Sequence, residues 1–318
     1  MPEHGSASLR HNRWRNPCGR MMQPMADASS YRGRFAPSPT GELHFGSLLA
    51  ALGSWLCARA ANGTWRVRIE DLDPPREVPG SADSILRMLH ACALEPDEAP
   101  LFQNTRTGAY SAALRRLLEN GHVFPCWCSR SDLAARAGAH RGVCVAPTDP
   151  QREPAWRVRV GNAVIAFKDG LQGLQRWPLS MDGDFVVKRA DGPFAYQLAC
   201  AVDDAAQAIT QVVRGADLLD STPRQIFLLR LLGLREPAYL HLPVAVDARG
   251  RKLSKSEGAA AIDPRDPVPA MRMALALLGI PRAALQARTP RTLMRSALAA
   301  FDPAALPRQK TLEVRAGA

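Results

Sequence analysis

The segment 31–70 constrains the fold of this 318-residue chain more strongly than any other part of its sequence. A short strand is expected over 31–36, and it runs into the turn 37–41, whose sequence is PSPTG. Apolar residues at three- and four-residue spacing predict a helix over 46–61, and an alternating pattern predicts a second strand over 65–70. Strand, helix and strand form a βαβ unit, which implies parallel pairing with a right-handed crossover.

The second of these strands alternates between apolar and charged residues. Its pattern directs Trp65, Val67 and Ile69 toward the core and Arg66 and Arg68 outward. We therefore expect this strand to present one apolar and one charged face.

The rest of the chain continues to alternate between helical and extended patterns. Helices are expected over 80–92, 105–120, 195–207 and 218–232. Strands are expected over 155–160, 163–168, 184–188, 209–214 and 241–246. This alternation predicts an α/β fold with a Rossmann-like, doubly wound parallel sheet.

Changes in composition divide the sequence into regions. Residues 1–30 are polar and irregular, and we expect them to be a disordered extension, or an addition upstream of a start near Met21–Met25. The α/β pattern covers 31–256, with an insert at about 121–148 that is rich in Cys, Gly and His. Residues 257–318 are expected to form a short helical C-terminal region that prolines interrupt.

Charge and cysteine content limit the classes of partner and compartment. The formal net charge of +11 suits a polyanion, although arginines outnumber lysines 36 to 5 and an Arg-rich proteome explains the charge equally well. No apolar run approaches ~18 residues, so we expect no membrane span. The seven cysteines are sparse and odd in number, which favours a reducing, cytoplasmic environment.

A first motif lies between the first strand and its helix, over 35–47. The carboxyl end of a parallel strand is where α/β folds bind ligands, and a helix N-terminus attracts phosphates. Gly41 and Gly46 permit close backbone approach, and His44 can donate to a phosphate oxygen. The alternative is an ordinary Pro-Gly turn that carries an incidental His.

A second motif is the basic stretch 252–256, with the sequence KLSKS. It holds two of the five lysines, Lys252 and Lys255, separated by hydroxyl-bearing Ser254. Compact cations on a loop suit a triphosphate whose transfer depends on charge stabilisation. The alternative is a solvated basic loop.

A third motif, Cys126-x-Cys128 followed by His140-x₃-Cys144, has the composition of a structural zinc site. Thiolates two residues apart on an extended segment face the same way, and the second pair completes four ligands. His122 is the alternative source of the imidazole, and buried free cysteines are the alternative to a metal site.

The first two motifs together resemble the two signatures of class I aminoacyl-tRNA synthetases in their glutamyl form. The resemblance spans about 31–258 and continues, in order, through EDLD at 70–73, YQLA at 196–199 and VRGADL at 213–218. In one departure, the first signature often ends in a second His, where this chain has Ser47. The resemblance implies that 31–256 is a catalytic domain.

Matching positions imply roles for individual residues. Those implied for ATP, bound with Mg²⁺, are His44, Gly46, Ser47, Lys252, Ser254 and Lys255, of which His44 and Lys255 are catalytic. Those implied for glutamate are Arg34, Phe35, Ala36, Pro37, Ser38, Glu70, Tyr196 and Arg214. Arg34 and Arg214 would clamp carboxylates, Glu70 would hold the ammonium, and Tyr196 would wall the pocket.

The resemblance is strongest to a short glutamyl paralogue that shares the metal spacing. It implies a monomer that activates glutamate with ATP and without tRNA, and then attaches it to queuosine in the anticodon of tRNA(Asp). Only 62 residues follow Ser256, too few for the anticodon-reading domain expected of a discriminating synthetase. The alternatives are a truncated glutamyl-tRNA synthetase that charges the 3′ end, and an inactive zinc-containing RNA-binding module.

Overall fold

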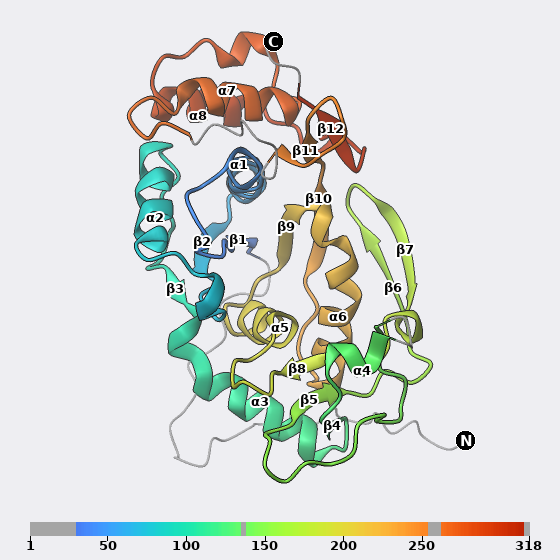
Figure 1. Ribbon diagram of the computed structural model, residues 1–318. Helices are drawn as coiled ribbons and strands as arrows, with labels where there is room; N and C mark the ends of the chain where they lie inside the picture. The colour runs from blue at the N-terminus through green and yellow to red at the C-terminus, as the bar shows by residue number, and fades with distance from the viewer. Residues whose placement is uncertain (1–29, 135–137, 254–261, 315–318) are drawn as a thin grey trace, which may run out of the picture. The chain divides into compact units, whose positions relative to one another are not determined.

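The computed structural model describes residues 30–134, 138–253 and 262–314 (Figure 1). The chain divides into two units, 1–30 and 31–318, and every element below belongs to the second. Residues 1–29, which make up nearly all of the segment expected to be disordered, lie outside the described part of the chain, and so do Ser254 and Lys255.

The N-terminal βαβ unit is confirmed. Strand β1 (Arg32–Phe35) pairs in parallel with β2 (Thr64–Ile69), and helix α1 (Phe45–Ala60) connects them. Strand β3 (Leu101–Phe102) extends this sheet in parallel on the far side of β2. Helix α1 buries its apolar residues against the sheet, as their spacing predicted.

A second group of parallel strands lies beside the first. Strands β9 (Gln211–Gly215), β10 (Ala238–Leu242) and β6 (Val164–Asp169) pair in parallel, and β7 (Gly173–Pro178) is antiparallel to β6. The Thr210 amide donates to the Arg32 carbonyl at 2.9 Å, which joins the β9 side to β1. The fold is therefore α/β with parallel sheets, but the parallel strands are divided between two hydrogen-bonded sheets.

Four helices accompany these sheets close to their predicted ranges. They are α2 (Ser81–Ala91), α3 (Thr107–Glu119), α5 (Tyr196–Ala206) and α6 (Thr222–Leu231). Helices α3, α5 and α6 share one apolar cluster, whereas α1 and α2 belong to another.

Arg68 corrects the expectation of an outward charged face on β2. Its side chain is completely buried, because β2 lies between β1 and β3 and α5 covers the face to which Arg68 points. Period-two alternation predicts exposure only for a sheet with one solvated face, and parallel sheets are covered on both.

The insert contains more regular structure than its sequence predicts. It holds strand β4 (Val123–Cys126) and the short helix α4 (Arg130–Ala134). Strand β4 joins an antiparallel sheet with two strands from beyond the insert, β5 (Ala155–Val158) and β8 (Val186–Lys188). The sequence therefore missed β4 and α4, and it also missed β7.

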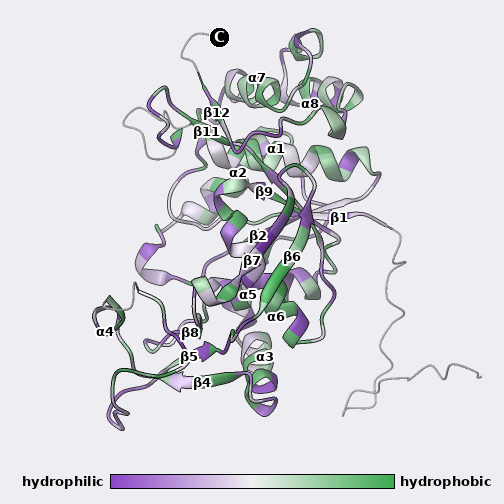
Figure 2. Ribbon diagram, turned by 90° about the vertical axis from the view of Figure 1, so that its right-hand side faces the viewer, coloured by the Kyte–Doolittle hydropathy of each residue, from purple (hydrophilic) through white to green (hydrophobic). Residues whose placement is uncertain are grey.

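The C-terminal part of the unit is mostly helical. Helices α7 (Val268–Leu277) and α8 (Pro290–Ala299) pack near α1, and Figure 2 shows α7 as mostly hydrophobic. The strand predicted over 241–246 is divided at Pro243 into β10 and β11 (Val244–Val246), and β11 pairs in parallel with β12 (Thr311–Glu313). Among the described residues, no helix has the length and apolar character to cross a bilayer.

Candidate active site and metal centre

One cavity of about 920 Å³ opens at the carboxyl ends of β1, β2, β9 and β10. This edge is where α/β folds place their ligands. The cavity brings together every described residue that the sequence associated with ATP or glutamate: Arg34, Phe35, Ala36, Pro37, Ser38, His44, Gly46, Ser47, Glu70, Tyr196, Arg214 and Lys252.

The start of helix α1 forms one wall of the cavity. His44 is the N-cap residue, and its Nδ1 accepts a hydrogen bond from the Ser47 amide at 3.2 Å. Its Nε2 lies 3.1 Å from the Ser47 hydroxyl oxygen, so the serine that replaces a second His contacts the first. Burial lowers the pKa of His44, which favours a neutral imidazole beside the helix N-terminus.

Two glycines shape this wall. Gly41 has φ +147°, a conformation that L side chains rarely adopt, and its carbonyl accepts from the Ser81 hydroxyl. A Cβ at Gly46 would stand only 3.3 Å from the His44 ring. The absence of a side chain at Gly46 therefore leaves room for the His44 ring.

Lys252 also lines the cavity and pairs with Asp217, with Nζ and Oδ2 3.0 Å apart, and both charges influence the pKa of His44. Both side chains are partly exposed, so solvent weakens the pair and a phosphate can compete for the ammonium.

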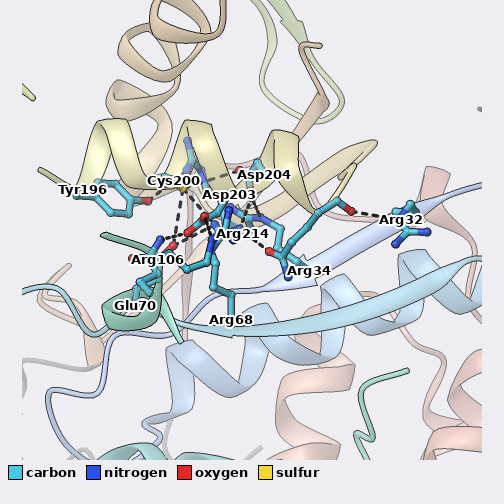
Figure 3. A network of polar contacts seen from close by, with 12 residues as sticks. Arg32, Arg34, Arg68, Glu70, Arg106, Tyr196, Cys200, Asp203, Asp204 and Arg214 are labelled. Atoms are coloured by element: carbon cyan, nitrogen blue, oxygen red, sulfur yellow. Dashed lines mark hydrogen bonds and ion pairs between the residues drawn. The ribbon is translucent and has the colours of Figure 1, made fainter. Parts of the chain in front are cut away.

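A buried ionic network (Figure 3) includes Arg34 and Glu70, which line the cavity. Asp204 of α5 accepts from Arg34 Nε at 3.1 Å and from Arg68 Nη1 at 2.7 Å. Arg68 Nη2 also donates to Glu70 at 3.1 Å. Burial alone raises the pKa of Asp204, but Arg34 and Arg68 outweigh it and lower this pKa to about 2. The network holds Arg34 and Glu70 in place at the cavity.

Glu70 has the electrostatic character of a cation site. Burial raises its pKa, although Arg68 and Arg34 oppose this effect. A ligand ammonium beside this carboxylate would favour its ionised form.

Arg214 is held by contacts from several elements. Its Nη1 donates to the Tyr196 hydroxyl at 3.3 Å, and its Nη2 donates to Thr222 Oγ1 at 2.7 Å. Its Nε lies 3.1 Å from His241 Nε2 on the neighbouring strand. The guanidinium is therefore fixed in one plane at the edge of the cavity.

The predicted metal ligands also meet. One ligand atom from each of Cys126, Cys128, His140 and Cys144 lies within 4.8 Å of all the others, while His122 is not part of the group. His140 Nε2 is buried and has no hydrogen-bond partner among the described residues. Three thiols and an available imidazole nitrogen fit zinc in a closed, structural site.

Asp184 is not one of the four ligands, but it contacts His140 on the side of the ring away from the thiols. Its Oδ2 lies 2.9 Å from His140 Nδ1 and accepts from the Gly142 amide at 2.8 Å, while its Oδ1 accepts from the Val160 amide at 3.0 Å. A proton on Nδ1, shared with the carboxylate, leaves His140 Nε2 free to bind a metal.

Sequence reasoning missed four residues that support these sites: Arg68, Asp184, Asp204 and His241. One signal was available, because Asp203 and Asp204 interrupt an otherwise apolar helix. Asp203 accepts from Tyr110 at 2.6 Å and from Gln103 at 2.9 Å. Adjacent acids on a buried helix require partners of this kind.

Comparisons with known proteins agree with this architecture. The family model for the catalytic domain of class I tRNA synthetases (E and Q) matches residues 30–287. A glutamyl-Q tRNA(Asp) synthetase of Xanthomonas oryzae pv. oryzae is 56% identical over 284 residues, covering 88% of this chain and 94% of the relative. One of Burkholderia cenocepacia is 57% identical over 263 residues, covering 79% and 88%.

A solved structure supports the fold. The glutamate tRNA ligase of Elizabethkingia meningosepticum superposes with a TM-score of 0.76 at 24% identity, covering 89% of this chain and 67% of the ligase. The chain therefore belongs to the glutamyl-Q tRNA(Asp) synthetase branch of the class I aminoacyl-tRNA synthetases, a family of ligases.

Proposed function

We propose that this enzyme activates glutamate with ATP, without tRNA, and transfers it to queuosine in the anticodon of tRNA(Asp). The observation that carries the proposal is the single cavity that collects both sets of predicted ligand-binding residues. The acceptor is proposed from the names of relatives that are 56% and 57% identical.

Glutamate carries two carboxylates and one ammonium, and the cavity offers two arginines and one carboxylate. In the proposed complex Arg34 and Arg214 pair with the carboxylates, and Glu70 pairs with the ammonium. Phe35, Ala36, Pro37 and Ser38 line the cavity beside Arg34, and Tyr196 closes it near Arg214. Glutamine would leave one buried guanidinium without a charged partner, which disfavours it.

ATP enters as its Mg²⁺ complex beside the N-terminus of α1. His44, Gly46 and Ser47 would contact the phosphates there, and Lys252, which lines the same cavity, would add its positive charge. Ser254 and Lys255 are proposed to act with Lys252, and Lys255 would neutralise the leaving pyrophosphate.

Two displacements complete the reaction. A glutamate α-carboxylate oxygen attacks the α-phosphorus, the bond to the β-phosphate breaks, and pyrophosphate leaves. A hydroxyl of the queuosine cyclopentene ring then attacks the adenylate carbonyl carbon, loses its proton and displaces AMP. An anticodon loop suits this step because its unstacked bases can enter a protein pocket.

The remaining expectations complete the proposal. Zinc on Cys126, Cys128, His140 and Cys144 would stabilise the insert at about 121–148, away from the chemistry. We propose a cytoplasmic monomer with its catalytic domain over 31–256 and a C-terminal region over 257–318. The three described cysteines outside this zinc site, Cys57, Cys92 and Cys200, are free thiols, which agrees with a reducing compartment.

The first test is glutamate-dependent exchange of labelled pyrophosphate into ATP, without tRNA. The proposal predicts exchange with glutamate and little with glutamine. Exchange that requires tRNA would contradict tRNA-independent activation. Equal exchange with both amino acids would remove Arg34 or Arg214 from the site.

A further inference from the structure

A row of polar side chains lies behind Arg214 on three neighbouring parallel strands. Arg214 on β9 is directly opposite His241 on β10, and Asp169 ends the adjoining strand β6. We propose that Asp169 and His241 are positioning residues that fix Arg214 for a substrate carboxylate. This inference rests on the proposed function, in which that substrate is glutamate.

The contacts determine where the protons lie. Arg214 Nε can only donate, so His241 Nε2, 3.1 Å away, must accept. The imidazole proton is then on Nδ1, which lies 2.6 Å from Asp169 Oδ2. Asp169 therefore selects the tautomer of His241 that can hold Arg214.

Asp169 is itself fixed by the backbone. Its Oδ1 accepts from the amides of Leu171 at 3.0 Å, Gln172 at 2.9 Å and His241 at 3.2 Å. These bonds leave Oδ2 directed at the imidazole. Together with the His241 ring, the three backbone amides hold the Asp169 carboxylate in one rotamer.

Burial keeps the row in one protonation state. The side chains of His241 and Asp169 are fully buried. Burial lowers the pKa of His241, although the hydrogen bond that His241 donates to Asp169 opposes this. The groups that face the imidazole are Asp169, Arg214, the Thr222 hydroxyl and the Tyr239 ring, which stacks on it. Arg34 adds a more distant positive charge.

The functional consequence concerns the guanidinium plane. His241 occupies the Nε–H, while Tyr196 and Thr222 contact the two terminal nitrogens. A guanidinium held in this way needs little reorganisation when a carboxylate binds. Loss of His241 as an acceptor would leave a buried Nε–H without its partner and free the plane to rotate.

The sharpest test is Asp169→Asn, which preserves size. The Asn oxygen would keep the three backbone contacts, and its NH₂ would then donate to His241 Nδ1. His241 would carry its proton on Nε2, where it would face the Arg214 Nε–H. We expect KM for glutamate to rise about tenfold or more in pyrophosphate exchange, with KM for ATP nearly unchanged.

Nitrogen-15 NMR of labelled His241 reads the tautomer without any assay of activity. We expect Nδ1–H in the natural protein and Nε2–H in Asp169→Asn. Asp182→Asn is the matched control, because Asp182 accepts from Trp177 at 2.9 Å and pairs with Arg224 instead. This control should leave KM for glutamate unchanged.

A second pair of variants serves if Asp169→Asn does not fold. His241→Gln retains an oxygen that can accept from Arg214, whereas His241→Phe retains ring volume only, so KM for glutamate should rise more with Phe. An Nε2–H tautomer in the natural protein, an unchanged KM in folded Asp169→Asn, or equal effects of Gln and Phe would overturn the positioning role. The proposed function fails separately if the natural enzyme shows no glutamate-dependent exchange, and the glutamate role of the row then falls with it.

Discussion

Asp204 joins two arginines beneath the cavity, and its removal would leave both with less compensation. We expect Asp204→Asn to reduce the free energy of unfolding by about 3–5 kcal/mol at pH 7, because breaking a buried ion pair exposes the full cost of the remaining charge. Urea unfolding measures this loss. Asp263→Asn is a control, since that carboxylate pairs with Arg265 at the surface and should leave stability unchanged.

Asp204→Asn also tests whether the Asp204 carboxyl group is ionised in the folded protein. The pKa of Asp204 is about 2 in the folded protein, below its ordinary value of 3.8. A lowered carboxyl pKa stabilises the fold above the unfolded pKa, and this stability is lost as pH falls through the folded pKa. The difference in free energy of unfolding between the natural protein and Asp204→Asn should therefore decrease from about pH 4 to pH 2. A difference that does not change with pH would contradict an ionised Asp204.

Asp184 provides a test of the metal centre. Asp184→Asn would donate to His140 Nδ1 and place the ring proton on Nε2, the nitrogen that faces the thiols. We expect zinc affinity, measured by chelator competition, to fall about 10–100-fold. Asp182→Asn should bind zinc normally, and equal affinity in both variants would show that Asp184 does not orient the ligand.

Single residues also show where prediction from sequence stops. The motif residues are identified through the family resemblance of short consecutive stretches, and spacing alone would assign no role to Arg34 or Glu70. Arg68 and Asp204 are far apart in sequence, with Nη1 and Oδ1 2.7 Å apart only after α5 packs on β2. No local pattern reports such a contact.

At the scale of elements, the turn that connects α1 to β2 requires a glycine at position 63. A Cβ there would stand 2.3 Å from the Tyr31 carbonyl oxygen, so backbone would have to move. We expect Gly63→Ala to lower the free energy of unfolding by about 1–3 kcal/mol. Gly108→Ala in α3 is the control, because a Cβ meets nothing within 4 Å there and should be neutral or stabilising. Equal unfolding curves for the two variants would contradict this close approach.

Strands β7 and β12, neither of which the sequence predicts, share a physical reason. Strand β7 is largely exposed and is defined by its pairing with β6, and β12 is defined by its pairing with β11. Such strands have weak hydrophobic patterns of their own, because tertiary pairing determines them. The βαβ unit was predicted well, because its periodicity and its turn agree locally.

At the scale of the whole enzyme, the central claim is that glutamate from the adenylate reaches queuosine. The site supports activation through its own residues, but the acceptor depends on relatives. The 3′ terminal ribose of a tRNA and the cyclopentene of queuosine both carry hydroxyl groups that can attack the adenylate, so the decisive experiment separates these two acceptors.

The most direct measurement is transfer of labelled glutamate to purified tRNA(Asp), with and without queuosine. Each tRNA is tested intact and after a nuclease has removed its 3′ terminal adenosine, a treatment that leaves the queuosine hydroxyls unchanged. The account predicts label only on queuosine-containing tRNA, and label that survives removal of the 3′ adenosine. Label that requires the 3′ adenosine and ignores queuosine would contradict the account and indicate a glutamyl-tRNA synthetase that charges the 3′ end.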